Sequence, residues 1–232
     1  MELSKKENYN FEDLKEIMRI LRSENGCPWD KEQTHKSIRN NFIEEVYEAI
    51  EAIDDEDPGL LKEELGDVLL QIVFQAQIGS ESGEFDIDGV CDGICKKLII
   101  RHPHIFADTV ADDSAQVLSN WENIKIKEKG YAGDREYIES AAKSLPALMR
   151  AEKIQKRIIK RKIAEQPSTG EIIKKLKEIM EIWEKSEQHN IDSETIGGIL
   201  YDVVTLANTC DINSEQALYD FNKKVIESVK IK

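Results

Sequence analysis

Long apolar runs are absent from this sequence. No uninterrupted stretch reaches the roughly 18 apolar residues that a membrane-spanning helix requires. Residues 1–6 also lack the apolar stretch of a secretion signal. We therefore expect no membrane partner, and we expect the protein to be cytoplasmic.

Cysteine and proline are scarce, with four and five residues in a chain of 232. The cysteines include no CxxC pair and are too sparse for a disulfide scaffold. Cys91 and Cys95, one helical turn apart, are expected to be small buried side chains. Strand-like alternation is also absent, whereas apolar residues recur with helical spacing. The sequence therefore predicts an all-α fold.

The chain lacks an excess of positive charge, since its formal net charge is −14. A general nucleic-acid-binding protein is expected to carry a basic patch, so we expect no nucleic-acid partner. An acidic protein can still bind a phosphorylated small molecule if a bound Mg²⁺ cancels the like charge.

Helical periodicity recurs from the first residues to the last. It predicts helices over residues 11–25, 37–54, 58–78, 86–100, 114–128, 145–165, 171–188, 193–209 and 214–229. Asp57 followed by Pro58 is a typical helix start, because Asp caps free amide groups and Pro fits the first turn. Residues 79–83 are predicted to break the chain, and residues 130–133 have the composition of a linker. The later helices repeat the rhythm of the earlier ones, which suggests duplication of a helical unit.

The helix expected over residues 37–54 carries several glutamates. At about 100° per residue, its apolar side chains form one arc. Glu44 points away from this arc, where a solvated charge belongs, while Glu45 lies at the edge of the arc. Glu48 is the i+3 neighbour of Glu45, so the two carboxylates are close enough to share a cation.

The next helix is apolar around nearly all of its circumference, which is typical of an inner helix. Glu64 and Asp67 lie within it at i,i+3 spacing. Because burial of an unpaired ionised carboxylate is costly, such groups are paired or bind metal. Four carboxylates form a hard-oxygen site that suits Mg²⁺ or Mn²⁺, and no His or Cys joins them to suggest zinc. The alternative is that these acids are surface charges or pair with Lys and Arg.

The acids lie in a pattern that resembles a known family. EEVYE at 44–48 followed by ELGD at 64–67 matches the EExxE…ExxD motif of the MazG nucleotide pyrophosphohydrolases. Flanking blocks match as well, namely GCPWD at 26–30, QT at 33–34, KEELGD at 62–67, RHPHIF at 101–106 and WENIK at 121–125. The resemblance covers residues 8–130.

The resemblance implies an all-α helical bundle that is completed by dimerisation, so a homodimer is expected. It implies that a nucleoside triphosphate and water give a monophosphate and pyrophosphate with Mg²⁺, for which Mn²⁺ could substitute. The implied metal ligands are Glu45, Glu48, Glu64 and Asp67. The implied substrate-binding residues are Lys97 and Arg101, which match a KxxxR motif that contacts phosphates, and Trp121, which matches a tryptophan near the nucleotide. Glu44 is a candidate catalytic partner for the attacking water, or only a surface charge.

The second half carries a decayed form of the same motif. Residues 177–181 read KEIME at the EExxE position, and Thr195 and Gly198 replace the two acids of the inner helix. The KxxxR pair reads Lys224 and Ser228. We expect this half to fold without binding the catalytic metal.

Three segments follow from this comparison of the two halves. Residues 1–130 are expected to form a MazG-like catalytic domain, and residues 131–145 a linker. Residues 146–232 are expected to form a degenerate second copy of the helical domain.

Two other functions remain open on the sequence alone. The chain could be a non-catalytic helical interaction or regulatory module with a vestigial nucleotide site. All four acids and their basic partners are retained in the first half, which argues against this. The substrate could also be narrower, such as a deoxyribonucleoside triphosphate or phosphoribosyl-ATP, and only the flanking blocks argue against that.

Overall fold

The computed structural model describes residues 6–107, 109, 113–141, 143–184 and 192–229. Every regular element in these residues is helical, which confirms the predicted all-α class. Within the same residues, no helix combines the length and apolar character needed to cross a membrane.

The chain forms two compact units, residues 1–121 and 122–232. Their boundary falls inside helix α7 (Ser114–Lys129), whereas the expected boundary at residue 130 follows the end of that helix. Each unit is described by itself below.

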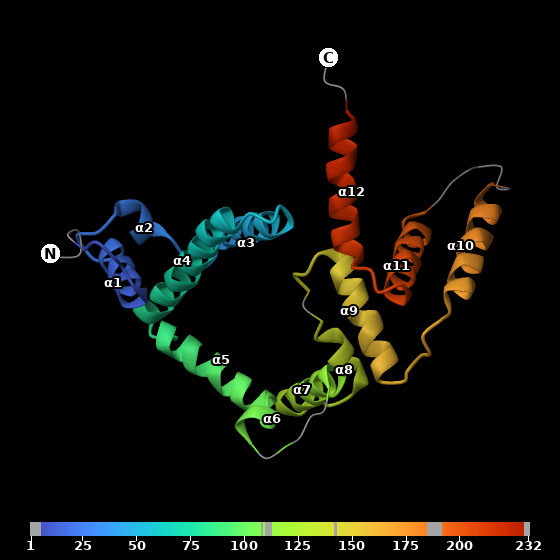
Figure 1. Ribbon diagram of the computed structural model, residues 1–232, viewed down its shortest axis with the longest axis horizontal. Helices are drawn as coiled ribbons and strands as arrows, with labels where there is room; N and C mark the ends of the chain where they lie inside the picture. Colours follow the sequence, from blue (N-terminus) through green and yellow to red (C-terminus); the bar gives the residue numbers. More distant parts are fainter. Residues whose placement is uncertain (1–5, 108, 110–112, 142, 185–191, 230–232) are drawn as a thin grey trace. The chain divides into compact units, whose positions relative to one another are not determined.

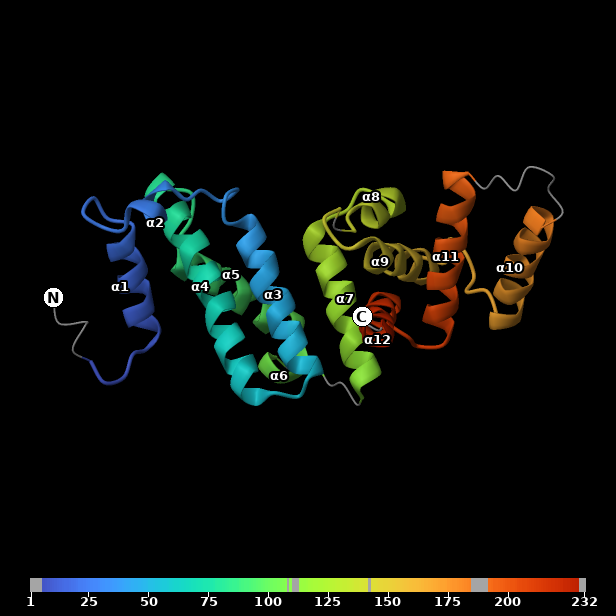
Figure 2. The same cartoon turned by 90° about the horizontal axis from the view of Figure 1, so that it is seen from above.

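The first unit is built around a long helix, α4, against which α1, α3 and α5 pack. Its helices are α1 (Phe11–Leu21), α2 (Pro28–Glu32), α3 (Arg39–Asp54), α4 (Pro58–Ser82), α5 (Ile87–Arg101), α6 (Pro103–Phe106) and the first part of α7. Helices α3 and α4 lie side by side in both views (Figures 1 and 2). They are joined by the short turn 55–57, in which Glu56 adopts a left-handed φ of 52°.

Helix α1 begins as capping rules predict but ends earlier than expected. The Asn10 side chain accepts hydrogen bonds from the amides of Glu12 and Asp13, and the Asp13 side chain bonds back to the Asn10 amide. The helix stops at Leu21, because the chain turns back there and the Cys27 amide donates to the Leu21 carbonyl. The predicted end at residue 25 was therefore wrong.

Helix α4 starts as predicted and continues further. The Asp57 carboxylate accepts from the amides of Gly59 and Leu60, with Pro58 in the first turn. The helix was predicted to break over residues 79–83, but α4 runs to Ser82, so the prediction was wrong for residues 79–82. A side chain at Gly79 would collide with the Phe85 ring, so this glycine serves packing.

The core of the first unit lies against the second half of α4. Met18, Ile38, Val73 and Phe74 form its buried cluster. The first half of α4 is less covered than expected of an inner helix, and Leu65 is 53% exposed in the single chain. Cys91 and Cys95 on α5 are exposed as well, so the expectation of burial was wrong for both.

The second unit contains the rest of α7 and five further helices. They are α8 (Asp134–Glu139), α9 (Ala147–Lys160), α10 (Thr169–Glu184), α11 (Ser193–Thr209) and α12 (Ser214–Ser228). Helix α11 packs against α9, α10 and α12. The end of the helix expected over residues 171–188 lies outside the described residues.

The segment expected as a linker contains α8, which is packed rather than extended. Tyr137 of α8 is buried, donates to the Glu122 carboxylate at 3.0 Å and lies beneath the Arg157 guanidinium. Burial and the Glu122 charge raise the pKa of Tyr137 to about 12. This segment therefore belongs to the core of the second unit.

Met18 offers a direct test of the first core. We expect Met18→Ala to lower the free energy of unfolding by about 2–5 kcal/mol, because it leaves a cavity among buried neighbours. Urea titration would measure the change. The control, Met180→Ala, removes a side chain that is 56% exposed and should stay within about 0.5 kcal/mol of the parent. Equal effects of the two substitutions would contradict this description of the core.

Candidate functional site

Helices α3 and α4 supply the four acids that the sequence singled out. Because the turn between these helices is short, they run antiparallel, and the middle of α3 lies opposite the first half of α4. Glu45 and Glu48 on α3 therefore face Glu64 and Asp67 on α4.

Three of the four acids come together closely. One carboxylate oxygen from each of Glu45, Glu48 and Glu64 lies within 4.8 Å of the others. Oxygens that share one Mg²⁺ lie up to about 4.2 Å apart, twice the metal–oxygen distance of about 2.1 Å. Small side-chain movements are therefore enough to let these three residues hold one cation.

Asp67 lies beside this group without belonging to the closest three. Its negative charge raises the pKa of both Glu45 and Glu64. The structure therefore places Asp67 where it could join the site as a further ligand.

The electrostatics of the cluster favour a cation. Partial burial raises the pKa of Glu45, and the charges of Asp67, Glu48 and Glu64 raise it further. Burial also raises the pKa of Glu64, with added repulsion from Glu48, Asp67 and Glu63. In the part of the chain that the structure describes, no lysine or arginine forms an ion pair with the four acids. The alternative of pairing with Lys or Arg is therefore not observed there, and the hard-oxygen donor set fits Mg²⁺.

Glu44 lies outside the cluster. It is exposed on α3, about 100° around the helix from Glu45. Its suggested role in holding the attacking water stays a prediction.

The structure brings two of the three expected substrate-binding residues together. Arg101, at the end of α5, is mostly buried, and its guanidinium lies 5.1 Å from the ring centre of Trp121, a cation–π distance. Lys97 is exposed one turn earlier on α5. Helix α5 leaves α4 at the C-terminal end of α4 and diverges from α3, so its last turn lies apart from the α3–α4 pair (Figure 1).

Sequence reasoning missed a polar extension of the acidic face of α4. Gln71 and Gln75 follow Asp67 at successive i+4 positions, and this spacing was the available signal. The oxygen Oε1 of Gln75 lies 2.5 Å from Nδ1 of His35, whose ring stacks near Phe85.

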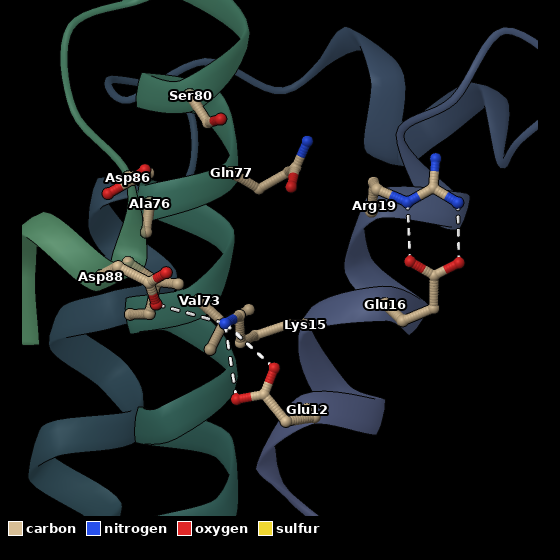
Figure 3. A pocket seen from close by; sticks show the side chains of 11 residues that line it. Glu12, Lys15, Glu16, Arg19, Val73, Ala76, Gln77, Ser80, Asp86 and Asp88 are labelled. Carbon is tan, nitrogen blue, oxygen red and sulfur yellow. Dashed lines mark hydrogen bonds and ion pairs between the residues drawn. The ribbon is translucent and has the colours of Figure 1, made fainter.

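A separate hollow of about 270 Å³ lies between α1, the second half of α4 and the start of α5. None of the four acids lines it. Most of its charged side chains bind one another, with the Arg19 guanidinium paired to Glu16 and the Lys15 amine paired to Glu12 and Asp88 (Figure 3). This hollow is therefore not a candidate for the chemistry of the acidic cluster.

The second unit shows no comparable metal group among its described residues. Glu178 and Glu181 keep the acidic positions on α10 but are exposed, and Thr195 and Gly198 on α11 offer no carboxylate.

Repulsion within the cluster gives a pH prediction for metal-free protein. A raised pKa means that Glu45 contributes stability at low pH that is lost as the pH rises above the usual glutamate value. Glu45→Gln should therefore raise the thermal unfolding midpoint in EDTA at neutral pH, and the gain should shrink at about pH 4, where the parent carboxyl group is largely neutral.

Calorimetry at the two pH values would test this. The control is Glu178→Gln at the corresponding position of the second unit, where Lys174 lies 3.8 Å away and no gain is expected. A Glu45→Gln variant that is less stable than the parent at neutral pH would contradict the repulsion.

Comparison with known proteins agrees with this site. Residues 33–106, which include all four acids, match the MazG nucleotide pyrophosphohydrolase domain. The chain is 42% identical over 214 residues to the nucleoside triphosphate pyrophosphohydrolase of Escherichia coli (strain K12), covering 90% of this chain and 81% of that protein. It is 39% identical to the nucleoside triphosphate pyrophosphohydrolase/pyrophosphatase MazG of Thermotoga maritima, covering 95% and 84% respectively.

A further relative is longer than this chain. The uncharacterized protein YabN of Bacillus subtilis is 50% identical over 148 residues, which are 64% of this chain and 30% of that protein. The domain match and the two relatives that align with at least 90% of this chain indicate the same family. The chain therefore belongs to the MazG family of nucleotide pyrophosphohydrolases, a family of hydrolytic enzymes.

Proposed function

We propose that this chain is a Mg²⁺-dependent nucleoside triphosphate pyrophosphohydrolase whose activity resides in its N-terminal half. The observation that carries the proposal is the convergence of the carboxylates of Glu45, Glu48 and Glu64, with no lysine or arginine paired to them among the described residues. The names of the relatives from E. coli and T. maritima support the choice of substrate class.

The acids would hold the cation from two helices. Glu45 and Glu48 provide oxygens from α3, Glu64 provides them from α4, and Asp67 is the proposed fourth ligand. When bound, Mg²⁺ or a substituting Mn²⁺ lowers the pKa of a water molecule and neutralises phosphate charge. Glu44 is proposed to orient the attacking water from the outer side of α3.

Basic residues of α5 would act on the phosphates. Lys97 and Arg101 are proposed to stabilise the charge on the leaving pyrophosphate. Trp121, which already contacts the Arg101 guanidinium, would lie near the nucleotide. Base stacking on an aromatic ring tolerates different bases, which fits a broad or non-standard nucleotide preference.

A homodimer would complete this arrangement. The first half of α4 exposes Leu60, Leu65 and Leu69, and the last turns of α5 expose Leu98 and Ile99. Exposed apolar faces of this kind mark association surfaces. Pairing of two copies would cover these side chains. It would also bring basic residues of one copy close to the acidic cluster of the other, since within one chain the end of α5 lies apart from α3.

The identity of the cleaved bond provides a first test. We expect purified protein with Mg²⁺ and a panel of nucleoside triphosphates to release pyrophosphate and the monophosphate. Asp67→Asn should lower kcat/KM by at least about 10–100-fold, the range found when even outer partners of metal ligands are removed. Orthophosphate as the sole product would reject the proposed cleavage, and full activity of Asp67→Asn would remove Asp67 from the site.

The assignment to the N-terminal half is tested in the full chain. Glu48→Gln should abolish most activity, again by at least about 10–100-fold, because it removes a proposed ligand. Glu181→Gln, the matched substitution in the second unit, should retain parental activity and Mn²⁺ affinity. A similar loss in both variants would contradict the assignment.

A further inference from the structure

The inference concerns Gln71, one turn beyond Asp67 on α4. At about 100° per residue, Gln71 lies roughly 40° from Asp67 and roughly 20° from Glu64 around the helix. All three therefore share the face that α4 turns toward α3. Gln71 occupies the layer between the acidic cluster and the bond between Gln75 and His35.

Gln71 is buried without a hydrogen-bond partner. The residue is 7% exposed, and its oxygen Oε1 is enclosed and unpaired. The amide makes no hydrogen bond to any residue that the structure describes. An unsatisfied buried polar group destabilises a fold. The enclosed oxygen can only accept a hydrogen bond, so the NH₂ group is the part of Gln71 that is able to donate to a neighbouring carboxylate.

The next glutamine along the same face of α4 differs from Gln71, because its amide oxygen has a hydrogen-bond partner. Gln75, the next residue on the same face, has its oxygen bound by His35. The glutamine of that layer is therefore satisfied where Gln71 is not, although Nε2 of His35 is also buried there without a hydrogen-bond partner.

The second unit provides an internal comparison. Aligning Glu64 and Asp67 with Thr195 and Gly198 places Gln71 opposite Asp202, which is also 7% exposed. The oxygen Oδ1 of Asp202 accepts a hydrogen bond from the Lys175 amine at 2.8 Å, although Oδ2 is unpaired.

Aligning residues 44–48 with residues 177–181 on the preceding helices places Lys175 opposite Phe42, whose side chain has no hydrogen-bonding group. The unit that lost the inner acids thus supplies a partner from its own α10 for this buried position. The unit that kept the acids supplies none from α3.

We propose that Gln71 is a positioning residue of the metal centre, whose side-chain amide donates to the Asp67 carboxylate and holds it as a ligand when the cation is bound. Gln and Asp side chains four residues apart on a helix are within hydrogen-bonding reach. Outer partners of this kind orient metal ligands and tune affinity. The inference rests on the proposed metal site.

The test measures Mn²⁺ binding and stability rather than turnover. Gln71→Met keeps the length of the side chain and removes the donor. We expect the dissociation constant for Mn²⁺, measured by calorimetry or electron paramagnetic resonance without nucleotide, to rise by about 10–100-fold. The unfolding midpoint in EDTA should stay equal or rise, because the substitution removes an unsatisfied polar group.

Gln155→Met is the matched control. Gln155 is 4% exposed, and both ends of its amide are bonded, to the Tyr201 carbonyl at 2.9 Å and to the Asn208 amide at 2.7 Å. This substitution should lower the unfolding midpoint and leave Mn²⁺ binding unchanged.

A double variant tests whether Gln71 acts through Asp67. Adding Gln71→Met to Asp67→Asn should weaken Mn²⁺ binding no further, since the two residues act as one unit. Additive losses would overturn the proposal. Equal Mn²⁺ affinity of Gln71→Met and the parent would overturn it too, as would weaker binding accompanied by a lower unfolding midpoint in EDTA. Failure of the parent chain itself to bind Mn²⁺ would instead reject the proposed metal site.

Discussion

The antiparallel packing of α3 against α4 is the constraint on which the site depends. It forces like charges together, since each helix brings acids to the shared face. Burial and mutual repulsion raise the pKa of Glu45 and Glu64, so the cluster opposes the stability of the metal-free fold. A divalent cation would convert this repulsion into attraction. The same acids therefore weaken the metal-free fold and would favour a cation-bound one, as in other sites where function is retained at the expense of stability.

A comparison of the two units suggests how the repulsion among the acids is relieved where the acidic motif is lost. The second unit replaces the inner acids with Thr195 and Gly198, and its buried Asp202 forms an ion pair with the exposed Lys175. One oxygen of Asp202 is thus bonded from α10 of the same unit. The first unit leaves the corresponding amide of Gln71 unsatisfied.

Local chemistry made part of this structure predictable. The start of α4 follows from the capping of backbone amides by Asp57, and the convergence of the glutamates follows from i,i+3 spacing on two adjacent helices. The continuation of α4 through Gly79 was not predictable, because it depends on the Phe85 ring folding back onto the helix. The exposure of Leu65 was not predicted either, for a similar reason. Helical periodicity shows which residues are apolar, but it does not show which partner covers them.

The turn at residues 55–57 also limits how the chain can vary in length. Glu56 holds a left-handed conformation there, which a residue with a side chain adopts only at some cost. One inserted residue could be absorbed only by reshaping this strained turn or by rotating α4 by about 100° relative to α3. Such a rotation would turn Glu64 away from its partners on α3. Variation in length is therefore far easier to accommodate in the connection between α9 and α10 than in this hairpin, where the number of residues decides how the acids of α3 and α4 face one another.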